Sequence, residues 1–236
     1  MKKIKLIKNF SSLFLRANKA QGILEVVIAI SIVVVGLVSI MSLVVFNVTT
    51  QDYNHDMLIA SNLAREGIEV IRSMRDSNWL DSTKDWDDSI FMGDVSYFDK
   101  NKNSFIIMNN ASWFANDFTY RVYPVGMFWE DCIKEKAGIN SVVCKLSLVP
   151  LKERPDYKVF DYWGDFIDGS ENTNFYRLIY INEICDVGGA EDILTNYAER
   201  CADDSKIGMQ IISKVGWMNR GEMRTLEVEE RLYNWK

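Results

Sequence analysis

One acidic side chain stands at the edge of a long apolar run near the N-terminus. Glu25 precedes residues 26–46, which contain no charged residue and are long enough for one helix across a hydrocarbon core of about 30 Å. An ionised carboxylate at the centre of a membrane helix costs about 2.5–3.5 kcal/mol, so an acid here indicates a functional site with a cationic partner. If the chain were cut after Ala20, the new α-amino group of Gln21 would lie one helical turn from Glu25 and would be such a partner.

Four cysteines form the second group of reactive side chains: Cys132, Cys144, Cys185 and Cys201. In an oxidising compartment an even count favours disulfides, and the sequence-local pairing, Cys132–Cys144 with Cys185–Cys201, is one of three connectivities. Zinc is disfavoured because no CxxC spacing is present and the only histidine, His55, lies far along the chain on a predicted helix.

No residue pattern indicates catalysis. A Ser-His-Asp or Cys-His apparatus would depend wholly on His55, and nothing in the sequence places a nucleophile beside it. The acidic groups within 81–88 and 161–168 do not match a calcium loop, and Gly188-Gly189 lacks the Lys-Ser/Thr of a phosphate loop. We therefore expect no enzyme activity, no cofactor and no metal.

The segment before the apolar run is basic. It carries six cations and no acid: Lys2, Lys3, Lys5, Lys8, Arg16 and Lys19. The positive-inside rule keeps this N-terminus in the cytoplasm and sends the rest of the chain across the membrane. A secretory signal peptide is disfavoured, because its apolar core is about 7–15 residues and its cleavage site follows that core. An ordinary uncleaved anchor fits the length and the charge but leaves Glu25 without a role.

The spacing from Ala20 to Glu25 resembles the processing site of type IV prepilins and pseudopilins. In that family prepilin peptidase cuts after a small residue, usually Gly, and the fifth mature residue is Glu, which places the cut between Ala20 and Gln21. Cutting after Gly22 would make Glu25 the third mature residue, which does not fit. Gln21 stands where most members have a methylated Phe, so N-terminal methylation stays open. Residues 63–72 and 75–79 also look like the helix end of pilin-like proteins of the PilV or pseudopilin sort.

The resemblance implies a structural subunit, a minor pilin or pseudopilin of a type IV pilus or a type II secretion-like filament. Its implied partners are prepilin peptidase, other pilin subunits and the assembly machinery in the membrane. Glu25 would pair with the Gln21 amine of an adjacent subunit and favour one axial register. The precursor would be a single-pass protein of the cytoplasmic (inner) membrane with its head outside, and the assembled form a cell-surface filament.

Two alternatives remain at this point. The first is an uncleaved single-pass anchor that carries an extracellular binding or adhesion domain. The second alternative lies within the pilin class, because the sequence does not separate a type IV pilus from a secretion pseudopilus or a DNA-uptake system.

The net charge indicates which class of partner is disfavoured. It is −6 for the whole chain and becomes −12 without the six cations of the leader. Because an acidic head repels phosphates, we expect no direct nucleic-acid binding.

Periodicity predicts one long helix followed by a sheet. Apolar or small residues recur at three- and four-residue steps from Ala60 to Met74, and no turn cluster precedes residues 76–78, so one helix is predicted over about 23–75. The predicted strands are 118–123, 144–148, 175–181 and 209–215, with a hairpin formed by 206–217 and 222–233. Residues 81–103 and 150–174 are expected to be loops.

The predicted fold class is α+β, with a long N-terminal α-helix packed on an antiparallel β-sheet head arranged as a meander. The domain division is a cleaved basic leader at 1–20, a transmembrane or assembly half of the helix at 21–46, an amphipathic half at 47–77, and an extracytoplasmic β-rich head at 78–236. Small Ala64 and Gly67 are expected to let the sheet approach the helix closely.

Overall fold

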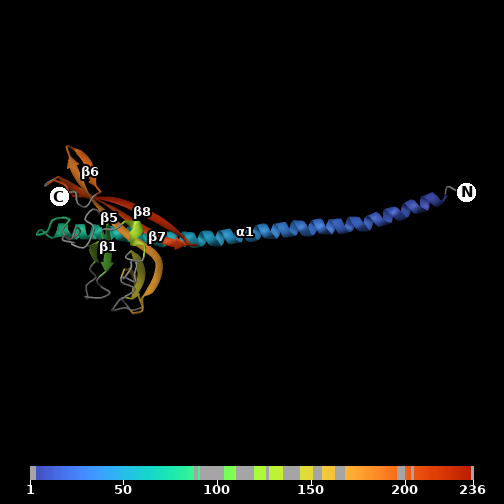
Figure 1. Cartoon of the computed structure of the whole chain (residues 1–236), viewed down its shortest axis with the longest axis horizontal. Coiled ribbons are helices and arrows are strands. Elements are labelled where there is room, and N and C mark those ends of the chain that lie inside the picture. The colour runs from blue at the N-terminus through green and yellow to red at the C-terminus, as the bar shows by residue number, and fades with distance from the viewer. Residues whose placement is uncertain are drawn as a thin grey trace. The chain divides into compact units, whose positions relative to one another are not determined.

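The computed structural model describes residues 4–87, 90, 104–109, 120–125, 128–134, 144–150, 156–162, 168–195, 200–202 and 205–234, with the side chains of the first helix described from residue 22 onward. The helices are α1 (Ile4–Leu80), which Figure 1 labels, and α2 (Trp129–Cys132). The strands are β1 (Ser104–Asn109), β2 (Tyr120–Pro124), β3 (Lys145–Pro150), β4 (Lys158–Asp161), β5 (Glu171–Val187), β6 (Ala190–Leu194), β7 (Lys206–Asn219) and β8 (Glu222–Tyr233). The chain divides into two compact units, Met1–Asn54 and His55–Lys236.

The first helix is longer than its pattern predicts at both ends. It begins at Ile4 and ends at Leu80, whereas periodicity predicts about 23–75. The leader contains neither Gly nor Pro, so its sequence does not stop a helix. At the other end the turn-forming residue Ser77 is accommodated, because its hydroxyl donates a hydrogen bond to the Ser73 carbonyl at 2.7 Å.

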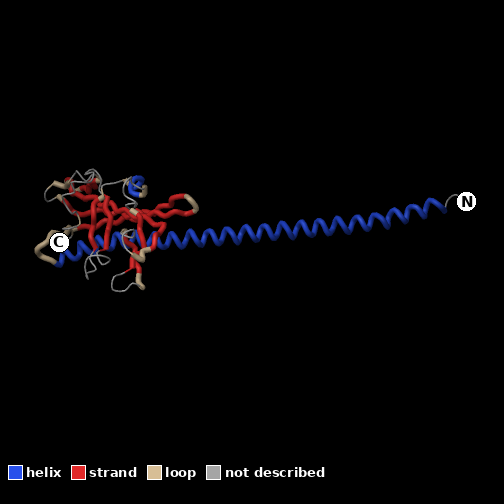
Figure 2. The backbone as a smooth tube through the Cα atoms, turned by 60° about the horizontal axis from the view of Figure 1, so that its bottom comes forward, coloured by secondary structure: helices blue, strands red, loops and turns tan. Residues whose placement is uncertain are grey.

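Strand β5 is the centre of the sheet in the second unit. One of its edges pairs with β7 from Phe175 to Cys185. The other edge pairs in succession with β3, β1 and β6. β7 also pairs with β8, β1 with β2 and β3 with β4, all antiparallel. Figure 2 shows the strands, in red, gathered beside the C-terminal end of the long helix. The antiparallel sheet is confirmed, but the predicted meander is wrong, because strands distant in sequence share β5 as their neighbour.

Most predicted strands coincide with observed ones, and one predicted loop is wrong. The segments predicted at 118–123, 144–148, 175–181 and 209–215 fall in or overlap β2, β3, β5 and β7. The loop predicted at 150–174 contains β4 and the first residues of β5. β4 forms because Val159 and Phe160 pair with Val149 and Leu148 of β3, a partner that local sequence does not reveal.

Two hairpins close through two-residue turns with left-handed backbone. Gly188 and Gly189 join β5 to β6 with φ of 66° and 89°. Arg220 and Gly221 join β7 to β8 with φ of 52° and 83°. Positive φ at both central residues matches the right-handed twist of the paired strands. The predicted C-terminal hairpin is confirmed, and its first strand extends two residues further, to Asn219.

The sheet packs on the last part of α1, within the second unit. The buried helix side chains include Ala60, Leu63, Ala64, Ile68 and Ile71, and the sheet side chains in the same clusters include Phe175, Ile179, Ile181, Ile211, Val215 and Trp217. These sheet residues all have odd numbers, and because side chains alternate between the two faces along each strand, they lie on the same face of the sheet. The other face of β5 carries Leu178, which packs with Trp129 of α2. The α+β arrangement of a long helix and an antiparallel sheet is confirmed.

Helix and sheet approach each other closely at Gly67. A Cβ atom built on Gly67 would lie 2.9 Å from Cδ1 of Ile179 and 3.0 Å from Oγ of Ser213. Both neighbours are fully buried, so they have little room to move. The close approach predicted for this small residue is confirmed.

Gly67→Val is therefore expected to lower the free energy of unfolding of the second unit by about 1–3 kcal/mol through overpacking. Urea denaturation of the full chain in detergent, followed by tryptophan fluorescence, measures this change. The matched control is Gly36→Val in the same helix, because a Cβ at Gly36 meets nothing within 4 Å. Equal unfolding midpoints for the parent and Gly67→Val would contradict the prediction.

Candidate functional site: an exposed apolar helix and two charged clusters

The first unit presents an apolar helix surface. Every large apolar side chain between Ile23 and Val48 is 49–69% exposed. Among the described residues, one helix is long and apolar enough to cross a membrane, and this segment belongs to it. A contiguous exposed apolar surface of this kind marks a site covered by lipid or by other chains. The helix is therefore a candidate membrane anchor.

The hydroxyl groups within this apolar surface are satisfied by the helix itself. Ser31, Ser39 and Ser42 each donate a hydrogen bond to the carbonyl four residues earlier, at 2.7, 2.8 and 2.9 Å. An unsatisfied polar group in hydrocarbon costs several kcal/mol, about the value found for transfer from water to an apolar liquid. Internal pairing removes that penalty, so these serines are compatible with a lipid environment.

The three residues of the predicted processing and assembly site lie along one stretch of α1. Gln21 and Glu25 are four residues apart, about one helical turn, so the backbone places them on one face. Glu25 is exposed, whereas the side chains of Ala20 and Gln21 lie outside the described ones. Cleavage and charge pairing require a peptidase and a second subunit, and both stay predictions.

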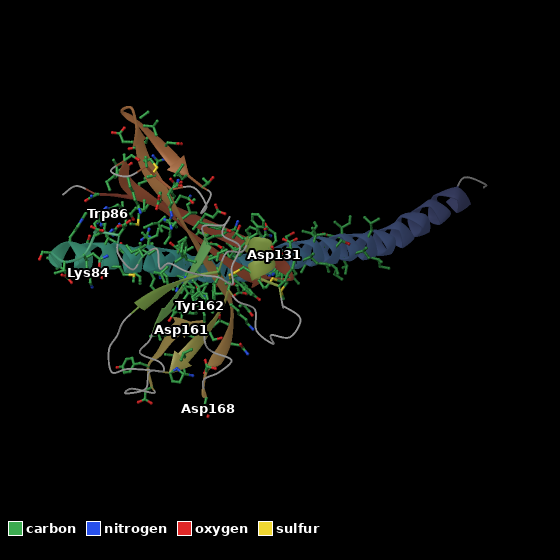
Figure 3. All side chains as sticks on the ribbon, turned by 60° about the vertical axis from the view of Figure 1, so that its left-hand side comes forward. Lys84, Trp86, Asp131, Asp161, Tyr162 and Asp168 are labelled. Atoms are coloured by element: carbon green, nitrogen blue, oxygen red, sulfur yellow. A yellow bond between two sulfur atoms is a disulfide. The ribbon has the colours of Figure 1, made fainter. Side chains whose placement is uncertain are left out.

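The remaining candidate ligands are dispersed. The side chain of His55 is 75% exposed, and its Nδ1 lies 3.8 Å from a carboxylate oxygen of Asp56. Asp161 is buried and accepts a hydrogen bond from the backbone N–H of Tyr162 at 2.7 Å, whereas Asp168 is exposed (Figure 3). In the part of the chain that the structure describes, no group of three or more His, Cys, Asp or Glu could hold a metal ion. Asp88 and Asp165 of the two acidic groups lie outside the described residues.

Two disulfides join the four cysteines in the sequence-local connectivity. Cys132 is bonded to Cys144 and Cys185 to Cys201, with Cα–Cα distances of 5.4 and 5.5 Å. The first bridge lies in the apolar cluster of α2, where both cysteines are fully buried. The second lies at the end of β5 that pairs with β6. Both suit an oxidising environment for the head, outside the cell.

A buried arginine joins the sheet to the helix. Arg177 of β5 is 2% exposed, and its Nη1 donates to the Leu63 carbonyl at 3.1 Å and to Oε2 of Glu66 at 3.2 Å. Its Nε donates to the Tyr162 hydroxyl at 3.1 Å, and that hydroxyl donates to the Arg177 carbonyl at 2.9 Å. Burial alone lowers the pKa of Arg177, but Tyr162 and Glu66 outweigh it and the pKa is raised. The guanidinium therefore remains charged inside the head.

Sequence reasoning missed this cluster. Helical periodicity places Glu66 off the apolar face of α1, and the carboxylate is in fact half-buried against the sheet. The alternation of side chains along β5 is the signal that identifies Arg177. It places Arg177 on the same face of the strand as Phe175 and Ile179, which are core residues. A charged residue at a core-facing position needs a buried partner.

A second charged cluster surrounds Glu183 of β5, whose side chain is 7% exposed. Its carboxylate accepts hydrogen bonds from Nη1 of Arg200 at 2.5 Å, from the backbone N–H of Cys201 at 3.0 Å and from Nζ of Lys206 at 3.1 Å. Lys206 also pairs with Asp87, in the loop after α1. The cluster therefore connects β5, the start of β7 and the loop that follows the helix.

The Glu183 cluster predicts a specific loss of stability in acid. Burial raises the pKa of Glu183, but the Cys201 N–H, Lys206 and Arg200 together lower it below the ordinary value of a glutamate side chain. A lowered folded-state pKa gives stability that is present above the unfolded pKa and is lost as pH falls through the folded pKa. The stability difference between the parent and Glu183→Gln should therefore be largest at pH 6–7 and shrink below about pH 4.5.

Urea denaturation of both chains at pH 6.5 and pH 4.0 measures this difference. The control is Glu171→Gln, which removes an exposed carboxylate paired with Lys158 at 2.5 Å and should change stability little at either pH. A parent-to-variant difference for Glu183→Gln that stays constant between the two pH values would contradict the assignment.

The described chain thus combines an uncovered apolar helix segment with a disulfide-bonded head that is fixed to the helix by buried charges. No protein-family model, curated protein or solved structure matches it.

Proposed function

We propose that this protein is a structural subunit of a pilus-like filament, a minor pilin or pseudopilin that is processed after Ala20 and assembled through the N-terminal half of α1. The observation that carries the proposal is the exposed apolar segment at 23–48, which has one acid, Glu25, at its N-terminal edge. Lipid covers this surface in the precursor, and the helices of neighbouring subunits cover it after assembly.

Cleavage supplies the partner of Glu25. Removing residues 1–20 deletes six cations and creates one α-amino group at Gln21. In lipid the carboxylate of Glu25 is unfavourable without a partner. In the assembled bundle it pairs with the Gln21 amine of an adjacent subunit, and axial registers that leave the charge unmatched are disfavoured. Charge pairing thus selects the stagger between subunits.

The head supports the proposal through its attachment to the helix. Residues 60–71 of α1 contribute buried side chains to the sheet core, and the Arg177 contacts fix the helix at Leu63 and Glu66. A subunit can therefore carry its head while its apolar half packs elsewhere. The two disulfides fit a head that lies outside the cytoplasm.

N-terminal sequencing and intact-mass analysis of the protein recovered from cells test the proposal. We expect a mature start at Gln21 and recovery of this form in a sheared surface fraction. Ala20→Leu should block cleavage because the site takes a small residue, whereas Ala20→Gly is the matched variant that keeps it. A surface form that still begins at Met1 would overturn the proposal and support the uncleaved anchor with a binding or adhesion head.

A further inference from the structure

A short segment, residues 200–202, is held on the end of β5 by a disulfide, a backbone hydrogen bond and an ion pair at two adjacent residues. Cys201 bonds through its sulfur to Cys185, and its backbone N–H donates to Glu183 at 3.0 Å. The preceding residue, Arg200, pairs with the same carboxylate at 2.5 Å. The carbonyl of Ser205 accepts a hydrogen bond from Asp186 N–H at 2.7 Å. We call the Cys185–Cys201 bridge with Glu183 and Arg200 the latch.

In this geometry the contacts of Arg200 and the Cys201 N–H with Glu183 depend on the Cys185–Cys201 disulfide. Cys185 and Glu183 are two residues apart on β5, so they occupy the same face. The bridge to Cys185 holds Cys201 over that face, with its N–H at the Glu183 carboxylate. Without the bridge, chain entropy opposes the approach of residues 200–202, which lie 16 residues further along the chain. Glu183 then loses donors while it remains a buried acid, which is unfavourable.

The latch also reaches the end of α1. Lys206 donates to Glu183 at 3.1 Å, pairs with Asp87, and lies 5.5 Å from the centre of the Trp86 ring. Asp87 and Trp86 belong to the loop that follows the helix, where Figure 3 labels Trp86. The contacts of Lys206 with Glu183, Asp87 and Trp86 therefore help to hold this loop against the sheet.

We propose that oxidation of Cys185 and Cys201 completes the Glu183 cluster, so that this end of the head closes only in an oxidising compartment. In the reaction the two thiols lose two protons and two electrons to a disulfide oxidant, which is reduced to two thiols. A chain that is still in the reducing cytoplasm keeps the latch open, and an exported head closes it. The inference rests on the proposed function only for the direction of export.

The other disulfide provides an internal comparison. Cys132 and Cys144 lie in an apolar cluster with Trp129 and Leu178, and the Cys144 N–H donates to the Cys132 carbonyl at 3.2 Å. Its loop is of similar size, with a separation of 12 residues. The bridge therefore supplies a similar covalent constraint in the apolar cluster of α2, and Cys132→Ala with Cys144→Ala is the matched control.

Tryptic cleavage of the Arg200–Cys201 bond reports on the latch in the full chain in detergent. We expect Cys185→Ala with Cys201→Ala to raise the cleavage rate about ten-fold or more, because cleavage follows the population of the open segment. Glu183→Gln, with both disulfides intact, should raise it by a smaller factor. The control pair at Cys132 and Cys144 should leave cleavage after Arg200 at the parent rate.

The combination of the three substitutions tests the coupling. If the latch is one unit, Glu183→Gln adds nothing once Cys185 and Cys201 are alanine, so the triple variant is cleaved at the rate of the cysteine variant. Independent effects that simply multiply would overturn the proposal. Parent-like protection of Arg200 in the folded cysteine variant would also overturn it.

A second measurement applies if the cysteine variant does not fold. The folded parent is reduced with dithiothreitol and then reoxidised with glutathione disulfide, and thiol alkylation and Arg200 cleavage are followed together. We expect protection of Arg200 to disappear and return with the Cys185–Cys201 bond. Reduced thiols at Cys185 and Cys201 with Arg200 still protected would overturn the latch. A Met1 start in cells would instead overturn only the proposed function.

Discussion

Replacing Arg177 with alanine is expected to lower the free energy of unfolding of the head by about 3 kcal/mol. Removing one partner of a buried ion pair costs about 3–5 kcal/mol, and we take the lower end because Glu66 keeps 36% of its side chain exposed. The substitution also leaves the Leu63 carbonyl and the Tyr162 hydroxyl without their guanidinium donor. Urea denaturation of the full chain in detergent, followed by tryptophan fluorescence, measures the loss.

Two further variants separate a charge effect from a loss of volume. Arg177→Met with Glu66→Gln removes both charges while it keeps much of the side-chain bulk, and it should lose less than half as much stability as Arg177→Ala. Arg231→Met is the matched surface control, because Arg231 pairs with Glu191 at 3.2 Å while 43% of its side chain is exposed. It should not measurably move the unfolding midpoint. Equal losses for the double variant and Arg177→Ala would contradict the ion-pair explanation.

Replacing Glu25 with alanine is expected to leave membrane insertion intact, or to improve it, and to reduce incorporation into filaments about ten-fold or more. A carboxylate in hydrocarbon costs about 2.5–3.5 kcal/mol at the helix centre, so its removal favours the membrane form. The same removal takes away the charge that is proposed to pair with the Gln21 amine, and about 1.4 kcal/mol of lost pairing corresponds to ten-fold. Immunoblots of the membrane fraction and the sheared filament fraction measure both quantities.

Ser31→Ala is the control for this experiment. Ser31 lies on the same exposed helix segment, and its hydroxyl bonds only locally in the described chain, to the Val27 carbonyl. This variant should resemble the parent in both fractions. Filaments that contain the Glu25→Ala chain at the parental level would remove the proposed role of charge pairing in assembly.

Local sequence predicted the elements whose signal is periodic or concentrated in a turn. Steps of three and four residues identified the buried positions from Ala60 to Ile71, and the glycine-containing loop identified the C-terminal hairpin. The end of β5 was not predicted, because the strand continues six residues beyond residue 181. Gly67 was recognised as a close-approach position because a small residue interrupts larger ones on an apolar face. Each of these features depends on the residues that form it and on few others.

Tertiary contacts that depend on distant partners could not be predicted in the same way. β4 exists through its pairing with β3, and β5 has more neighbours than a meander allows. The partner of Arg177 is a helix carboxylate 111 residues earlier in the chain. The donors of Glu183 come from residues 200–206, and a disulfide bonds this segment to β5. The alternation of side chains along a strand shows that such acids and bases face the core, but it does not identify the residues that they pair with.

The place of β5 in the chain has a consequence for how the protein is made. β1 with β2 and β3 with β4 form two hairpins, yet their common neighbour leaves the ribosome after all four of them. Among the described strands, nascent chains that end before residue 171 contain only these two strand pairs, which are marginally stable without the rest of the sheet. We therefore expect arrested nascent chains to gain protease resistance in one late step, once β5 and β7 have both emerged. Export of the head would then begin before the head folds, so that folding would not compete with export.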